Sequence, residues 1–306
     1  LPHGKTAVDP RQLPATLAQK LVARAAGVSH VTPGSVVMCK VDLAMSHDSS
    51  GPRRVAPLLR ELGAKVWDPS RFVVVTDHYV PAADPEAESI LRFTRDWVRE
   101  AGIQNFIDNE GICHVVLPER GHILPGRFIV GGDSHSPTGG AFGAYMFGIG
   151  ATEMAGVLAT GEIWLRVPNT IRVEWQGTLS DGVCAKDIML FLCATLGMAG
   201  GRYEVIEYTG STVKTLSMQE RMTLTNMSTE LGAQTALIAP DATTMAWLAD
   251  AGVDAATLAA IEPRQWRSDA DAPVLATHRF DAGTLVPQVA APHSPANSGP
   301  VDQAAG

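Results

Sequence analysis

A glycine-rich stretch carries an acid, a hydroxyl and an imidazole in three consecutive positions. Asp133, Ser134 and His135 lie between Gly131-Gly132 and Gly139-Gly140. Glycine lets the backbone approach a ligand closely, and loops at strand ends often hold binding and catalytic groups. An imidazole beside a carboxylate can transfer protons, so this stretch predicts an acid–base site. The alternative is a simple turn, in which Asp and Ser are favoured for local reasons.

Two more acid–imidazole pairs lie upstream. Asp77-His78 follows the β-branched run 71–75, which predicts a strand covered on both faces, and catalytic groups of α/β proteins commonly lie where such strands end. The carboxylate raises the pKa of its imidazole neighbour and orients it, which suits a general acid. His47-Asp48 lies in a polar loop that we expect after a strand over 35–41; the alternative is a helix entry with Asp48 or Ser49 as its cap.

A further histidine, His114, lies inside the apolar stretch 111–119, which we predict to be a strand. A histidine within such a strand is more often part of the core than a catalyst. The residues alone leave both interpretations open.

The elements that must position these groups alternate between strands and helices. This order predicts largely parallel sheets in two layered α/β units. We expect a flexible lead-in over 1–14, α/β units over 15–199 and 200–280, and a connector or tail rich in Pro, Gly, Ser and Ala over 281–306. Further strands are predicted over 128–130, 169–175, 203–208 and 235–239. Helices are predicted over 17–26, 55–62, 84–101, 187–199, 218–226, 243–250 and 254–261. Another helix is predicted to begin at residue 151, and its apolar positions include Leu165.

Composition excludes several classes of function. The chain has 306 residues, 45% of them hydrophobic, and a net charge of −8, which argues against a nucleic-acid partner. No apolar run is long enough to span a membrane, and no signal-peptide core is present. The four cysteines have no metal-site or disulfide spacing, so we expect buried free thiols and a cytoplasmic protein.

Several motifs, in the same order along the chain, resemble the aconitase superfamily, and most closely the large subunits of 3-isopropylmalate dehydratase and homoaconitase-type hydro-lyases. The matching stretches are Thr16–Lys20, Asp77-His78, Gly111–His114 with Pro118-Glu119, Gly132–His135, Gly148–Gly150 and Asn226–Ala233. The resemblance implies a three-layer α/β/α iron–sulfur domain with mostly parallel sheets. It also implies reversible dehydration of a hydroxy di- or tricarboxylic acid such as 3-isopropylmalate, a 2-methylmalate-type acid or homocitrate.

The resemblance also implies roles for individual residues. His78, paired with Asp77, would protonate the departing hydroxyl; Asp133 would orient His114; and His135 would pair with Glu230. Residues implied to contact substrate are His47, Ser134 and Asn226. We expect His78, His114 and His135 to converge on one pocket.

The cofactor and the partners follow from the same resemblance. Family members hold a [4Fe-4S] cluster through three cysteines, but Cys39, Cys113, Cys184 and Cys193 do not fall at those positions, so no metal ligand is assigned in this chain. The cluster cysteines and the carboxylate-binding arginines are expected in a C-terminal half, and a small swivelling subunit is the expected partner.

Two rival hypotheses remain. In one, the chain is a cluster-free lyase or hydrolase that holds a single divalent metal through His47, His78, His114 or His135. In the other, it is a non-catalytic subunit or fragment of an aconitase-like complex.

Overall fold

A five-stranded parallel sheet forms the centre of the N-terminal part of the protein. The computed structural model describes residues 13–304, so most of the lead-in expected over 1–14 lies outside the described residues. The strand order is β4-β3-β2-β5-β6, and every neighbouring pair is parallel. These strands are β2 (Leu43–His47), β3 (Phe72–Thr76), β4 (Asn105–Asp108), β5 (Phe128–Gly131) and β6 (Tyr145–Gly148).

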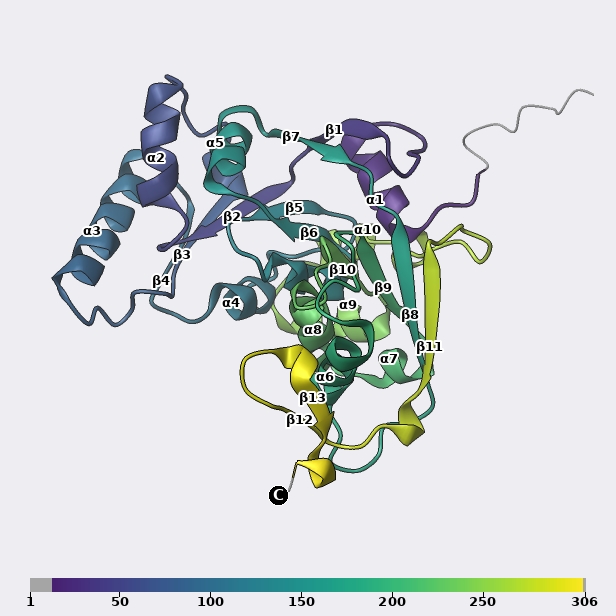
Figure 1. Cartoon of the computed structure of the whole chain (residues 1–306). Coiled ribbons are helices and arrows are strands. Elements are labelled where there is room, and N and C mark those ends of the chain that lie inside the picture. Colours follow the sequence, from purple (N-terminus) through teal and green to yellow (C-terminus); the bar gives the residue numbers. More distant parts are fainter. Residues whose placement is uncertain (1–12, 305–306) are drawn as a thin grey trace, which may run out of the picture.

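Helices cover both faces of this sheet, which explains the continuous apolar run in β3. Phe72 and Val74 face one core cluster, and Val73 and Val75 face another on the opposite side. The first face is covered by α1 (Leu17–Ala26), α2 (Pro52–Glu61), α3 (Pro85–Glu100) and α5 (Ala151–Thr160) (Figure 1). The second is covered by α4 (Cys113–Glu119), the 3-10 helix η3 (Ser136–Phe142), α8 (Met218–Asn226) and α9 (Ala242–Asp250). The predicted three-layer α/β/α class with parallel sheets is confirmed.

A second parallel sheet, of four strands, has the order β10-β9-β8-β11. Its members are β8 (Thr170–Gln176), β9 (Val205–Thr209), β10 (Thr235–Leu237) and β11 (Ala276–Asp281). Alternating residues such as Val173 and Trp175 pack against α6 (Ala185–Leu196). Arg172, Glu174 and Glu207 line a cavity of about 680 Å³. Helix α7 (Ser211–Thr215) completes this part, whereas α10 (Ala255–Ala260) lies beside α9 with Leu258 packed on the core of the first sheet.

Two antiparallel pairs complete the strands. β1 (Val36–Lys40) pairs with β7 (Glu162–Arg166), and β12 (Gln288–Ala290) pairs with β13 (Ser298–Pro300). The segment expected as a connector packs beside α6: the carboxylate of Asp187 accepts the N–H of Gln288 at 2.7 Å, and Leu285 is buried (Figure 1). The shorter 3-10 helices are η2 (Pro69–Arg71), η4 (Met227–Thr229), η5 (Pro263–Gln265), η6 (Ala282–Thr284), η7 (Pro295–Asn297) and η8 (Val301–Gln303).

Three predictions of local structure are wrong. Residues 111–119 do not form a strand: α4 begins at Cys113, and its buried residues Cys113, Val116 and Leu117 have helical spacing. The strand over 35–41 does not deliver His47 through a polar loop, because a separate strand, β2, ends at His47. Leu165 belongs to β7, because α5 ends at Thr160 and Gly161 follows it in the left-handed conformation.

The expected division between residues 199 and 200 stays a prediction. β8 and β9 lie on either side of that point and pair in the same sheet, so the change from the five-stranded to the four-stranded sheet falls between β6 and β8. Within residues 13–304, no helix combines the length and apolarity needed to cross a bilayer.

Candidate active site

The acid–imidazole pairs lie where three neighbouring parallel strands end. β2 ends at His47, β3 is followed by Asp77-His78, and β5 leads into the glycine-rich loop with Asp133. Because these strands are adjacent and parallel, their carboxyl ends meet at one edge of the sheet, where α/β proteins bind ligands. His114 reaches the same place from the first turn of α4.

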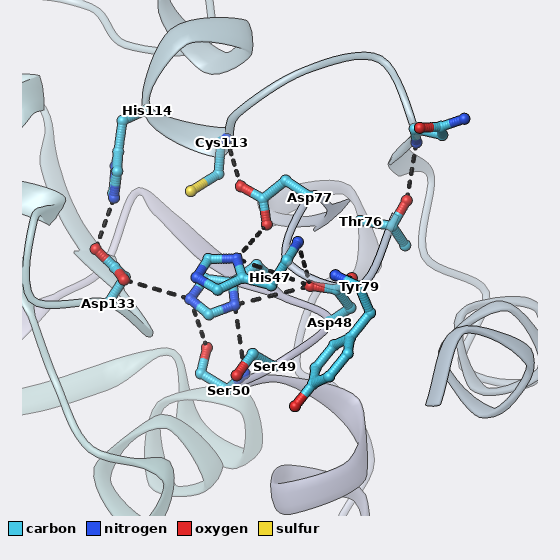
Figure 2. A network of polar contacts seen from close by, with 12 residues as sticks. His47, Asp48, Ser49, Ser50, Thr76, Asp77, Tyr79, Cys113, His114 and Asp133 are labelled. Carbon is cyan, nitrogen blue, oxygen red and sulfur yellow. Dashed lines mark hydrogen bonds and ion pairs between the residues drawn. The ribbon is translucent and has the colours of Figure 1, made fainter. Parts of the chain in front are cut away.

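Asp77 and His78 form a hydrogen-bonded pair. Nδ1 of His78 lies 2.6 Å from Oδ1 of Asp77. Oδ2 of Asp77 accepts the backbone N–H of Cys113 at 2.7 Å (Figure 2). Burial opposes ionisation of Asp77, but its hydrogen bonds from Cys113 and His78 outweigh burial and lower its pKa. An ionised carboxylate only accepts, so Nδ1 carries the hydrogen. The His78 side chain is 42% exposed, which leaves Nε2 free to face a ligand.

Asp133 connects two imidazoles. Its Oδ1 lies 2.6 Å from Nε2 of His114, and its Oδ2 lies 3.4 Å from Nε2 of His47 (Figure 2). Oδ1 also accepts the backbone N–H of His135 at 2.6 Å. Burial again favours the neutral acid, but the hydrogen bonds from His114 and His47 outweigh it and hold the pKa of Asp133 far below its ordinary value. This carboxylate is therefore charged and fixes both rings.

The third pair brings the two sheets together. Nε2 of His135 lies 3.9 Å from Oε1 of Glu230, a gap that a water or a substrate hydroxyl can bridge. Nδ1 of the same ring lies 3.4 Å from the backbone carbonyl of Asn226. Thr229 donates its hydroxyl to the carbonyl of Ser134 at 2.6 Å, which ties the glycine-rich loop to η4.

All nine residues proposed for the site lie in this region, although not all face the same space. The rings of His47 and His78 stack with centroids 3.8 Å apart, and those of His114 and His135 are 6.4 Å apart, so the imidazoles form a continuous network. Ser134 is exposed and lines a cleft of about 360 Å³ together with Asp133 and Thr229. The roles assigned to these residues stay predictions.

Two of the expected substrate contacts are engaged elsewhere. His47 is 3% exposed and lies beneath His78. The side-chain amide of Asn226 donates to the hydroxyl of Thr138 at 2.9 Å. Each side chain therefore supports a neighbouring element in the described structure.

Asp48 is the residue whose role the sequence interpretation missed. The sequence allows it to cap the following helix, but the N-cap of α2 is Gly51, and no side chain caps it. The Asp48 side chain is fully buried, and its two oxygens accept the backbone N–H groups of His78 at 3.1 Å and Tyr79 at 3.0 Å. The sequence shows an acid directly after an imidazole at a strand end. It does not show that the partners of this acid are the backbone amides of His78 and Tyr79.

The geometry argues against His47 and His78 holding one metal ion together. His47, Asp48, Asp77 and His78 place potential ligand atoms within 4.8 Å of one another. However, the two stacked rings are parallel to within 7°, and a metal ion binds an imidazole nitrogen close to the ring plane. An ion in the plane of one ring therefore lies far out of the plane of the other.

The cysteines do not fit an iron–sulfur cluster. Within residues 13–304, the group of histidines and acids just described is the only one close enough to hold a metal, and it contains no cysteine. Cys39, Cys113 and Cys193 are buried, whereas Cys184 is exposed, contrary to the expectation of four buried thiols. Burial raises the pKa of Cys39 to about 12 and that of Cys193 to about 11. These thiols are poor sources of thiolate ligands.

Acid–imidazole pairs at the carboxyl edge of a parallel sheet are suited to proton transfer, so the class of protein that they indicate is an acid–base enzyme. The sequence model of the aconitase family (aconitate hydratase) matches residues 19–306. A probable 3-isopropylmalate dehydratase large subunit of Methanothermobacter thermautotrophicus is 42% identical over 95% of this chain and 68% of the relative. A 3-isopropylmalate dehydratase large subunit of Methanopyrus kandleri is 44% identical over 95% and 68%. A probable methanogen homoaconitase large subunit of M. thermautotrophicus is 42% identical over 95% and 67%. The chain belongs to the aconitase family.

Proposed function

We propose that this chain provides the acid–base groups of a carbon–oxygen hydro-lyase. Its substrate would be a hydroxy di- or tricarboxylic acid of the kind named for its relatives, such as 3-isopropylmalate or homocitrate. The observation that supports the proposal most directly is the network from His78 through Asp133 to Glu230, which offers imidazoles and carboxylates to a single small molecule.

In this proposal His78 is the general acid. The ionised Asp77 accepts Nδ1–H of His78 and so directs the exposed Nε2 towards the ligand, where the protonated ring would give its Nε2 proton to the departing hydroxyl. Asp133 holds Nε2–H of His114, which leaves Nδ1 of that ring for the ligand. His135 and Glu230, which are 3.9 Å apart, are suited to hold a hydroxyl or the water that adds back.

The relatives' names also bear on the partner. They are large subunits, which implies a small subunit as the partner of this chain. We propose that the thiolate ligands of the family's cluster and the cations that bind substrate carboxylates come from polypeptide outside this chain. No proton transfer described above passes through that cluster.

Reconstitution tests this proposal. The chain would be combined with the small subunit and with the part of the M. thermautotrophicus dehydratase large subunit that this chain does not match, loaded with iron and sulfide, and assayed on 3-isopropylmalate, 2-methylmalate, homocitrate and citrate. We expect turnover of at least one acid and a loss of about 10² to 10⁴ in kcat for His78→Ala. His30→Ala, which replaces a half-buried loop histidine, is the control and should retain activity. A loaded complex that is inactive on every acid, or full activity of His78→Ala, would contradict the proposal.

A further inference from the structure

Asp48 lies directly beneath the catalytic turn. Its side chain is fully buried, and one oxygen accepts the N–H of His78 while the other accepts the N–H of Tyr79. A carboxylate without access to water is tolerated only when it is hydrogen-bonded, and here two consecutive backbone amides provide the bonds. Asp48 therefore fixes the backbone of the turn after β3, 30 residues away in the sequence.

His47 lies beneath the ring that this turn presents. Its imidazole is 3% exposed and stacks on that of His78 at 3.8 Å with an angle of 7°. Its Nδ1 accepts the backbone N–H of Ser50 at 3.4 Å, and its Nε2 faces Oδ2 of Asp133 at 3.4 Å. Both nitrogens are thus engaged within the protein, and the neutral Nε2–H tautomer satisfies both contacts. A ligand has no free edge of this ring to bind.

Apart from these contacts, little fixes the orientation of the His78 imidazole ring. Its side chain is 42% exposed, and its hydrogen bond to Asp77 leaves the ring free to tilt about Nδ1. An exposed side chain samples several rotamers unless packing selects one. The flat face of His47 provides that packing, and Asp48 fixes the backbone from which the His78 side chain starts.

We propose that His47 and Asp48 form a positioning platform that sets the orientation of the His78 imidazole. Neither residue touches the ligand, so both are positioning residues and not catalytic ones. The inference builds on the proposed function, because it explains how the general acid is held. It reassigns His47 from substrate contact to support.

The platform can be tested in the chain itself, without cofactor, partner or substrate. Long-range ¹H–¹⁵N spectra of histidine-labelled protein report which ring nitrogen of His78 carries hydrogen, and one-bond ¹H–¹⁵N spectra report how fast Nδ1–H exchanges, with His78→Gln assigning the signals. The charged groups that face the two rings are Asp77, Asp48 and Asp133; hydrogen bonds outweigh burial and lower the pKa values of Asp77 and Asp133, so the spectra are recorded at pH 6 to 8. We expect a protected Nδ1–H in the unsubstituted chain.

Three variants separate the parts of the platform. His47→Ala removes the stacked ring, and Asp48→Asn replaces one accepting oxygen with a donor; each should speed exchange of the His78 Nδ1–H about tenfold or more. His47→Phe restores a flat ring without nitrogens and should return exchange to within about twofold of the original rate. Asp68→Asn, the same change at a half-buried acid before β3 and distant from His78 in the sequence, is the matched control and should leave the signal unchanged. The other histidine signals show whether each variant is folded.

The platform proposal is overturned if Asp48→Asn and folded His47→Ala both leave the His78 signal unchanged. Should His47→Ala unfold, an unchanged signal in Asp48→Asn alone is sufficient to overturn it. In the reconstituted enzyme the same two variants should lower kcat about ten- to a hundredfold with KM nearly unchanged, because misplacement of a catalytic group affects the chemical step. Because the spectra need no turnover, failure of the platform is distinguishable from failure of the proposed reaction.

Discussion

Nε2 of His114 lies 2.6 Å from Oδ1 of Asp133, and this contact joins the first turn of α4 to the glycine-rich loop after β5. The same carboxylate also faces His47, so one negative charge orients imidazoles from two different elements. A shared carboxylate of this kind keeps the rings fixed before any ligand arrives. Such preorganisation is what a proton-transfer site requires.

Asp133 should make the stability of the protein depend on acid pH. Its pKa is lower in the folded state than in the unfolded chain, so its contribution is complete above the ordinary aspartate value of about 4 and is lost as pH falls through the folded-state pKa. Asp133→Asn should lower the free energy of unfolding by about 2 kcal/mol at pH 7 and flatten its fall below about pH 4. Urea unfolding at a series of pH values measures both. Asp250→Asn, at the exposed end of α9, should leave the acid slope unchanged; an equal slope in Asp133→Asn would contradict the prediction.

Gly140, in η3, is fixed by the close approach of β10. A Cβ atom there would lie 1.7 Å from the backbone oxygen of Ala236 in β10, and a rigid backbone cannot move aside cheaply. Gly140→Ala should therefore destabilise the protein by about 3 kcal/mol or more. Gly156→Ala is the matched control: nothing lies within 4 Å of its Cβ position in α5, and alanine favours helices by about 1 kcal/mol. Thermal unfolding should give opposite shifts, and a neutral Gly140→Ala would refute the close approach.

Arg221 connects α8 to the start of α9. Its side chain is fully buried, and its two terminal nitrogens each lie 2.8 Å from an oxygen of Asp241, the N-cap of α9. Arg221→Ala removes these bonds and leaves a cavity, at an expected cost of about 3 to 5 kcal/mol. Arg279→Ala breaks an exposed ion pair with Glu174 and should cost less than about 1 kcal/mol. Similar denaturant midpoints for the two variants would show that the buried pair is not the stronger one.

Cys184 should be the only thiol to react under native conditions. It is exposed, whereas Cys39, Cys113 and Cys193 are buried and their pKa values are raised by burial. Alkylation with iodoacetamide at pH 8, followed by mass spectrometry, should add one label per chain, and Cys184→Ser should add none. Rapid labelling of Cys113 would mean that α4 opens away from Asp77.

Local sequence patterns were sufficient for much of the fold. The run 71–75 could only be a strand covered on both faces, and it is β3. The predicted helix over 218–226 has the bounds of α8, because Ser217 and Glu220 form a capping box at its start. The sequence predicts a site in the glycine-rich loop, because a simple turn does not account for so many glycines near an acid and an imidazole.

The failures arose where contacts distant in the sequence decide the outcome. In α4 a seven-residue apolar segment fits either a strand or a helix, and its packing against the sheet decides between them. Asp48 lies next to a helix start, where a capping role is the usual expectation, yet its partners are the amides of His78 and Tyr79. No spacing rule within the sequence identifies such a pairing.

The glycine-rich loop is attached to both sheets. Ile238, just after β10, donates its N–H to the carbonyl of Gly140 at 3.0 Å, and the hydroxyl of Thr229 bonds the carbonyl of Ser134. A rotation of one sheet against the other would therefore pull on the loop that holds Asp133. Because His135 and Glu230 lie on these two attached segments, such a rotation would also change the 3.9 Å that separates Nε2 of His135 from Oε1 of Glu230.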